Sequence, residues 1–126
     1  MVEQAIRLSP RDARLGVWCL LIGTTHLLQS CTDEAIAWLE KARSANPAHP
    51  RVRDRLAAAY GLIGETERAA AELAEARRLS GDPDRFSSVS RLRAREYFYS
   101  SMAPEVRALW DATVVAGLRK AGLPEE

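Results

Sequence analysis

The chain repeats its own pattern of residue sizes at an offset of 34 residues, and this periodicity restricts it to folds that stack a repeated unit. Six positions of one register agree in the order bulky, small, ring, small, bulky, small. The pairs are Ile22 with Leu56, Gly23 with Ala57, His26 with Tyr60, Ala35 with Ala69, Leu39 with Leu73, and Ala42 with Ala76. Agreement at these positions predicts two copies of one structural unit.

Each copy has the pattern of a helical hairpin. In the second copy Leu56 and Tyr60 are four residues apart, which places them on one face of a helix. A break follows at residues 61–64, and Thr66 can then cap a second helix. The small residues allow two antiparallel helices to approach closely, while the large ones fill the space between them. We therefore expect two αα-hairpins stacked as a solenoid.

This size pattern resembles the tetratricopeptide repeat (TPR). That family combines a bulky–small pair, a ring three residues later, an alanine, then a bulky residue, a further alanine and a closing proline, which corresponds to Pro47 in the first copy. Two positions depart from the family pattern, because Arg53 stands where a large apolar residue is usual and Gly81 replaces the second closing proline. The resemblance implies an all-α fold, a TPR-like α-α superhelix (a right-handed helical-hairpin solenoid) with C-terminal capping helices.

The N-terminal residues indicate part of a further repeat. Ala5 and Pro10 are five residues apart, as are Ala42 and Pro47. We therefore expect residues 1–9 to be a half-repeat remnant, the end of a second helix whose first helix is missing, and the chain to be the end of a longer array. The interval from Pro10 to Pro47 is 37 rather than 34 residues, so the first helix of repeat 1 should be about one turn longer.

Beyond residue 80 the pattern ends, because Arg107 and Trp110 stand where leucine and alanine would recur. A turn-rich stretch precedes a short helix, and Pro104 begins a last helix with one apolar face. The predicted organisation is a single TPR-like domain over residues 1–126, with repeat 1 at 13–47, repeat 2 at 48–80 and capping helices at 88–122.

Two longer stretches resemble a more specific group of proteins. The segments AIRLSPRDARLGVW (residues 5–18) and GLRKAGLPE (residues 117–125) are similar to the C-terminal repeat region of bacterial class III adenylate cyclases, in which a cyclase domain comes first. Related repeat tails also follow winged-helix DNA-binding domains. The resemblance implies the non-catalytic, regulatory part of a larger bacterial signalling protein and leaves the upstream domain open.

The histidines and cysteines of this sequence are not spaced as they are in catalytic or metal-binding motifs. His26 and His49 are the only histidines, and their separation in sequence gives no local ligand motif. Cys19 lies at an apolar helix position, and Cys31 lacks the basic neighbours that activate a thiol. The sequence contains neither a phosphate-binding glycine loop nor a nucleophile elbow. We expect no enzyme activity, no cofactor and no metal.

Arg91, Arg93 and Arg95, followed by the aromatic residues 97–99, raise the alternative of a nucleic-acid-associated regulator tail, because arginines contact phosphates and aromatic rings stack on bases. Arginines at alternate positions lie about 200° apart on a helix, so the three do not form one stripe. A solvated helix followed by an aromatic plug is the favoured interpretation, and nucleic-acid binding is the weaker alternative.

By the family register, the first helices of the repeats line a concave groove that binds a peptide or a helix. The groove positions are Val17, Leu20, Thr24, Leu27 and Leu28 in the first copy, and Arg51, Asp54, Arg55, Ala58 and Leu62 in the second. Asp54 and Ala58 stand where one peptide-binding subset of the family has a lysine and an asparagine that clamp a terminal carboxylate, so we expect no such clamp.

These positions predict a protein–protein interaction or regulatory scaffold module. It would bury an apolar surface of a protein or peptide partner, and Arg51 and Arg55 would add charge-assisted hydrogen bonds. Two alternatives stay open: a structural homodimerisation tail that binds its own protomer, and a groove whose leucines pack only against the C-terminal helix of the same chain.

The net charge and the hydropathy pattern argue against two further classes of function, nucleic-acid or membrane-surface binding and membrane insertion. A formal net charge of +1 gives no general attraction to nucleic acid or to an anionic membrane. The longest apolar run, from Val17 to Ile22, is far shorter than the roughly 18 residues of a membrane-spanning helix. We expect a cytoplasmic protein with no membrane association.

Overall fold

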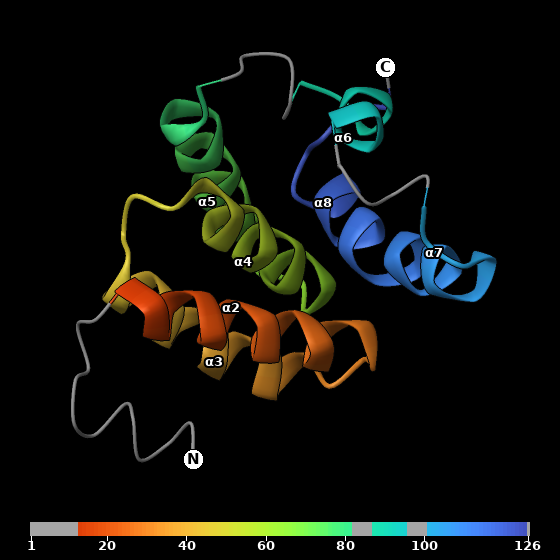
Figure 1. The fold of residues 1–126 in the computed structure, drawn as a ribbon. Coiled ribbons are helices and arrows are strands. Elements are labelled where there is room, and N and C mark those ends of the chain that lie inside the picture. The colour runs from red at the N-terminus through yellow and green to blue at the C-terminus, as the bar shows by residue number, and fades with distance from the viewer. Residues whose placement is uncertain (1–12, 82–86, 96–100, 126) are drawn as a thin grey trace.

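The computed structural model describes residues 13–81, 87–95 and 101–125 of the 126-residue chain (Figure 1). Within these residues every regular element is a helix. The elements are α2 (Ala13–Leu28), α3 (Thr32–Ala45), α4 (Pro50–Leu62), α5 (Thr66–Leu79), α6 (Val89–Arg95), α7 (Pro104–Trp110), η1 (Asp111–Val115) and α8 (Ala116–Lys120). The prediction of an all-α chain is confirmed. The half-repeat predicted for residues 1–9 lies outside the described residues.

The first four helices form two packed pairs. Helix α2 packs against α3 and α4 against α5, and the pairs meet mainly through α3 and α4 (Figure 1). Gly23 sets the distance within the first pair, because a Cβ atom there would lie 2.7 Å from Cγ of Leu39. At the equivalent position of the second pair, Ala57 is fully buried. Small residues at this position therefore bring both pairs together, as the sequence pattern predicted.

The two first helices end with the same backbone hydrogen bonds, displaced by 34 residues. In the first pair the amide of Cys31 donates to the carbonyl of His26 at 2.8 Å, and the amide of Ser30 donates to the carbonyl of Leu27 at 3.0 Å. The equivalent bonds of the second pair run from Glu65 to Tyr60 at 2.9 Å and from Gly64 to Gly61 at 3.2 Å. Two such bonds closing a helix end are a Schellman motif. The repeat seen in the sequence is therefore also a repeat of backbone geometry.

The Schellman motif requires one residue with a left-handed backbone conformation. The second copy has a glycine at this position, and the first copy has a serine. Gly64 has a φ of 83°, and Ser30, at the equivalent position, has a φ of 63°. Ser30 is the one non-glycine residue with positive φ among the described residues. A side chain makes this conformation unfavourable, so the first turn carries strain that the second turn lacks.

Helix α2 is longer than its counterpart. It has 16 residues, whereas α4 has 13, and both helices end at equivalent positions, Leu28 and Leu62. The extra turn therefore lies at the N-terminus of α2. The 37-residue interval between Pro10 and Pro47 predicted this longer first helix. The intervals from Pro10 to Ala13 and from Pro47 to Pro50 are equal.

The C-terminal elements α7, η1 and α8 form one continuous helical rod. The residues at both junctions, Asp111 and Ala116, have right-handed helical backbone angles. The middle five residues adopt the wider π-helical turn, and within this rod the Thr113 hydroxyl donates to the Leu109 carbonyl at 2.7 Å. The rod ends at Lys120, and Gly122, whose φ is 109°, follows it in the closing turn.

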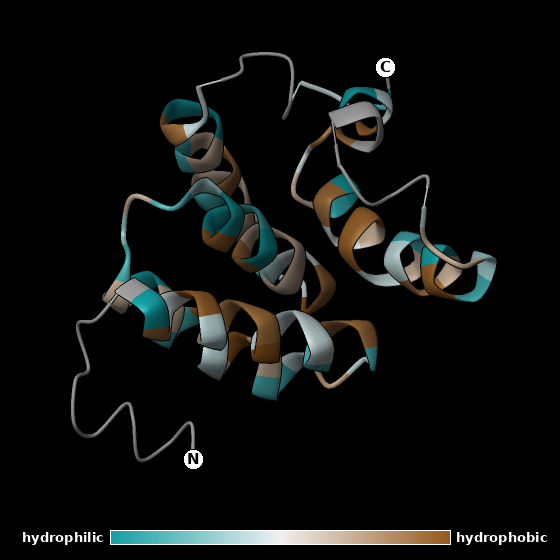
Figure 2. Cartoon of the chain, in the orientation of Figure 1, coloured by the Kyte–Doolittle hydropathy of each residue, from teal (hydrophilic) through white to brown (hydrophobic). Residues whose placement is uncertain are grey.

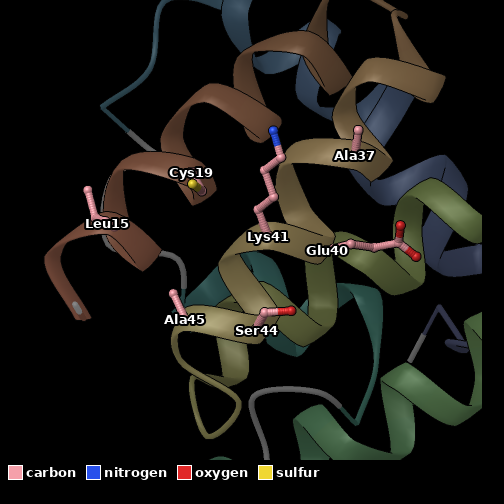
Figure 3. A pocket seen from close by; sticks show the side chains of 7 residues that line it. All are labelled: Leu15, Cys19, Ala37, Glu40, Lys41, Ser44 and Ala45. Atoms are coloured by element: carbon pink, nitrogen blue, oxygen red, sulfur yellow. The ribbon is translucent and has the colours of Figure 1, made fainter. Parts of the chain in front are cut away.

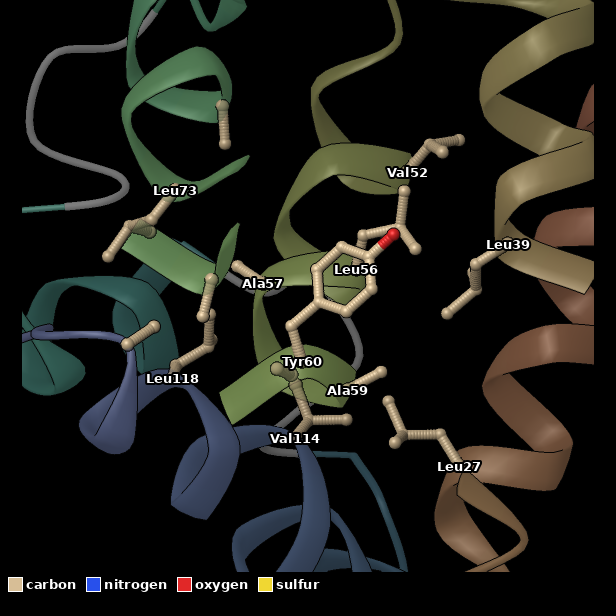
Figure 4. Close-up of a cluster of buried hydrophobic side chains, with 14 of the residues drawn as sticks. Leu27, Leu39, Val52, Leu56, Ala57, Ala59, Tyr60, Leu73, Val114 and Leu118 are labelled. Carbon is tan, nitrogen blue, oxygen red and sulfur yellow. The ribbon is translucent and has the colours of Figure 1, made fainter. Parts of the chain in front are cut away.

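One core joins both pairs and the C-terminal rod. Figure 4 shows side chains of α2, α3 and α4 meeting those of η1 and α8. The largest fully buried side chains include Tyr60, Leu27, Leu39, Leu56, Leu73, Leu118 and Val114. The C-terminal rod is therefore part of the core.

The strained turn leads to a stability prediction. Ser30→Gly should raise the free energy of unfolding by roughly 0.5–1 kcal/mol, because glycine adopts a positive φ without a steric cost. Gly64→Ala should lower it by about 1 kcal/mol, and this cost arises from the backbone alone, since a Cβ atom at residue 64 would have no atom within 4 Å. Urea unfolding followed by circular dichroism measures both changes.

Gly81→Ala is the matched control, because Gly81 also has open space around it but no positive φ. It should not lower stability. Equal responses at residues 64 and 81 would contradict the assignment of strain to the turn.

Candidate functional site

The groove predicted for the second copy is filled by the chain itself. Helix α4 packs against α8 and η1, and the described structure leaves Asp54 0%, Arg55 4% and Ala58 0% exposed. Arg51 and Leu62 are half-buried. The prediction that Arg55 is available to hydrogen-bond a partner therefore needs correction, because this guanidinium lies beneath the C-terminal rod.

Two contacts determine how the rod lies on α4. The Arg55 guanidinium forms an ion pair with the adjacent Asp54 and lies over the Trp110 ring, 4.5 Å from its centroid. A Cβ atom on Gly117 would lie only 2.1 Å from the Ala58 carbonyl oxygen, and one on Gly61 would lie 2.2 Å from the Gly117 carbonyl oxygen. The two helices thus meet backbone to backbone, and the absence of a Cβ at both glycines makes that distance possible.

The groove positions of the first copy divide into buried and open ones. Leu20 and Leu27 are 8% and 0% exposed and belong to the core. Thr24 is half-buried, and its hydroxyl donates to the Leu20 carbonyl at 2.7 Å. Val17 is 43% exposed and Leu28 is half-buried. Only part of the predicted groove is therefore open to a partner.

The sequence interpretation missed the most exposed residue of this surface. Leu21 is 60% exposed and lies one helical turn beyond Val17. We call Val17, Leu21 and Leu28 the groove face of α2, because their equivalents on α4 (Arg51, Arg55 and Leu62) are the predicted groove positions. The spacing from Val17 to Leu21 was the signal that could have identified it.

A second apolar stripe on α2 faces another direction. Trp18, Ile22 and Thr25 are spaced by four and three residues, and we call them the stacking face. Trp18 is 46% exposed, Thr25 is exposed and Ile22 is half-buried. Figure 2 shows hydrophobic residues along α2, which lies in front of α3 in this view.

A cavity of about 430 Å³ opens between α2 and α3 beside the stacking face (Figure 3). It is lined by Leu15, Cys19, Ala37, Glu40, Lys41, Ser44 and Ala45. Burial raises the pKa of the Cys19 thiol, and nearby Lys41 only partly opposes this effect. Cys19 is therefore a buried apolar residue and not an activated nucleophile.

The remaining candidate residues are dispersed. Cys31 is exposed in the first turn, and His49 caps the N-terminus of α4. The described residues contain no group of three or more His, Cys, Asp or Glu side chains placed to hold a metal ion. Arg91 is exposed on α6, and the side chains of Arg93 and Arg95 lie outside the described residues. No helix of the described ranges has the length and apolarity needed to cross a membrane.

Comparison with known proteins adds no assignment: no family model, no curated protein and no solved structure matches the chain significantly.

The glycine contact predicts that Gly117→Ala destabilises the protein by at least about 2 kcal/mol, because the new methyl group would collide with backbone atoms of α4 that cannot rotate away. Urea unfolding should show the loss, and near-ultraviolet circular dichroism should show a changed environment of Trp110. Gly81→Ala, where the added methyl group meets open space, serves again as the control. If Gly117→Ala were as stable as the wild type, α8 would not approach the backbone of α4 as closely as the structure shows.

His49 predicts a pH dependence of stability. Its Nδ1 accepts a hydrogen bond from the Arg51 amide at 3.3 Å, and burial, followed by the charges of Arg51 and Arg55, lowers the pKa of this imidazole. The unfolded chain therefore binds a proton first as the pH falls below about 6.5, and stability decreases from there toward the folded-state pKa. His49→Asn keeps an N-cap acceptor that does not titrate.

The variant should lose less stability than the wild type between about pH 7.5 and about pH 5.5, as urea unfolding at the two pH values can measure. An identical pH slope in both proteins would contradict a role for His49.

Proposed function

We propose that this chain is a non-catalytic helical-repeat module, TPR-like in architecture, that binds a helix of a partner protein on the groove face of α2. The observation that carries this proposal is the exposure of Leu21, at 60%, next to Val17, at 43%. Contiguous exposed apolar side chains on a folded domain mark interaction surfaces.

Helix α4, which is covered by a helical rod, indicates what kind of partner the groove face of α2 binds. On α4, Arg55 and Ala58 are covered by the helical rod of the same chain. The groove face of α2 continues this surface, because Leu21 is equivalent to Arg55 and Thr24 to Ala58 at an offset of 34 residues. Because the α4 half of this surface accommodates the C-terminal rod, the α2 half is suited to a second helix. The apolar stripe of an amphipathic helix matches it.

The energetics favour a modest, specific contact. Fully burying a leucine side chain contributes roughly 1.5–3 kcal/mol relative to leaving it exposed, and Leu21 has most of that contribution still to gain. Val17 and Leu28 extend the contact along the same helix. Association also has an entropic cost, so the partner helix must cover more than one of these residues.

The regulatory setting is the part of the proposal that rests on sequence resemblance. The similarity to repeat tails of class III adenylate cyclases favours a scaffold within a larger bacterial signalling protein, in the cytoplasm. In that setting the module would hold a partner helix close to the catalytic or DNA-binding part of the same polypeptide.

A photo-crosslinking amino acid tests the surface directly. Placed at Leu21 in the natural full-length protein and activated in the cells that produce it, the probe should form one dominant cross-link to a partner protein. The identified partner, purified, should bind the wild type and bind Leu21→Glu at least about tenfold more weakly, since a carboxylate would be buried at the centre of the contact.

Ala70 on α5 is the matched control site, because it is also exposed on the surface of a helix. The probe at Ala70 should not capture the same partner, and Ala70→Glu should leave the affinity unchanged. Cross-links from both sites alike would contradict the proposal. A cross-link to a second copy of the chain would replace it with the homodimerisation alternative.

A further inference from the structure

The second helices of the two hairpins differ in what covers one of their sides. Helix α3 packs on α4, and the side of α3 that meets the second hairpin has three half-buried residues, Ile36, Glu40 and Arg43. At an offset of 34 residues, the equivalent residues of α5 are all exposed. We call them the outer face of α5: Ala70, Ala74 and Arg77. The side of α5 that corresponds to an interface between hairpins is therefore open.

The stacking face of α2 is the other half of the same kind of interface. Trp18, Ile22 and Thr25 are equivalent to three residues of α4 that are 1%, 0% and 0% exposed, namely Val52, Leu56 and Ala59. Figure 4 shows Val52 on the side of α4 that faces α3. In this chain, such a face is thus covered by the second helix of a hairpin.

The residue sizes on these two open faces differ from those of the α3–α4 contact in opposite directions. On α2, Trp18 is larger than its equivalent Val52, whereas on α5, Ala70 is smaller than its equivalent Ile36. Bulky side chains pack into the spaces that small residues leave on a facing helix. The outer face of α5 is therefore complementary in size to the stacking face of α2.

A polar contact between the hairpins is also changed on both sides. The Tyr60 hydroxyl donates to Glu40 of α3 at 2.7 Å. The equivalent residues on the two open faces are His26 and Ala74, so a ring without a hydroxyl corresponds to a residue without a carboxylate. Replacing both members of a hydrogen-bonded pair costs little, because neither is left buried without its partner.

The ion pair between the hairpins changes in the same paired way. Arg43 of α3 donates to Glu72 of α5 at 2.5 Å. The equivalent residues are Arg77 and Trp38. The Trp38 ring already attracts a cation, since the Lys41 ammonium lies 4.6 Å from its centroid. A guanidinium group stacks well on an indole ring, so a cation–π contact can stand in place of the ion pair.

We propose that copies of this chain stack head to tail, with the outer face of α5 in one copy covering the stacking face of α2 in the next. The contact repeats the α3–α4 packing between two chains and buries Trp18 against Ala70 and Ala74. Because each chain carries one face of each kind, the interface is heterologous. A stacked pair therefore keeps one open face at either end, to which further copies add.

This inference goes beyond the function proposed for the groove face, because it concerns a different stripe of α2 and a different occupant. A photo-crosslinking probe at Ala70 should capture a second copy of the chain, whereas the probe at Leu21 should capture the partner protein. The purified chain alone is sufficient to test the stacking. Either proposal can therefore fail while the other holds.

Sedimentation equilibrium of the purified 126-residue chain tests the self-association. Concentrations from about 10 μM to about 1 mM cover the affinities of a contact between single helices. The weight-average mass should rise with concentration and pass that of a dimer, because stacked copies keep open faces. A monomer throughout this range would overturn the proposal.

Two variants that each block one face test the head-to-tail arrangement. Trp18→Glu should block the stacking face and Ala74→Glu the outer face of α5, so each variant alone should be a monomer. A mixture of the two should form a 1:1 dimer and nothing larger, because one intact face of each kind remains. This dimer would also show that both variants are folded. If Ala74→Glu alone still dimerises while Trp18→Glu does not, the stacking face pairs with itself and the proposal is wrong.

Ala71→Glu is the matched control for Ala74→Glu, since it places the same charge on an exposed alanine of the same helix. Ala71 is equivalent to Ala37, which stays exposed on α3 although α4 packs on that helix. This variant should associate as the wild type does. Equal losses of association in the two variants would overturn the assignment of the outer face.

Discussion

The backbone contact of Gly117 with Ala58 and Gly61 determines which surfaces of this protein are open. Carbonyl and Cα atoms of α4 and α8 approach so closely that no side chain fits between them. That distance lets Val114 and Leu118 of the C-terminal rod reach the core shared by both hairpins (Figure 4). The predicted groove is consequently filled along α4, and its open apolar part lies on α2. Other exposed apolar side chains of the described residues lie outside this groove, at Ile63, Val106 and Leu109.

Buried and half-buried charged residues also stabilise the packing of the helices. Asp54 and Arg55 are removed from water, and their mutual pairing together with the Trp110 ring offsets part of the cost of burying them. Glu72 of α5 joins Arg43 of α3 across the two hairpins and Arg53 of α4 within the second hairpin. Such pairs stabilise only when complete, because the loss of one partner leaves a buried charge uncompensated. They therefore fix the relative positions of the helices they join.

Local spacing predicted the local features of the fold. The 34-residue register anticipated the helix pairs, the turns at equivalent places and the longer α2, since each depends on residues near one another in sequence. The burial of Arg55 and Ala58 was not predicted, because it results from a segment more than 50 residues away. Glycines inside helices were the one available signal, and Gly61 and Gly117 meet where such residues indicate a close backbone approach. Leu21 was missed although the 34-residue register pairs it with Arg55, which was a predicted groove position of the second copy.

Helix α2 is apolar on nearly all sides, and such a helix is stable only when most of its surface is covered. Its groove face and its stacking face both carry exposed apolar side chains, Val17 and Leu21 on the first and Trp18 on the second. The groove face has no tethered candidate among the described residues, and a separate partner must meet the full entropic cost of association. Occupancy of the groove face should therefore depend on the partner's concentration.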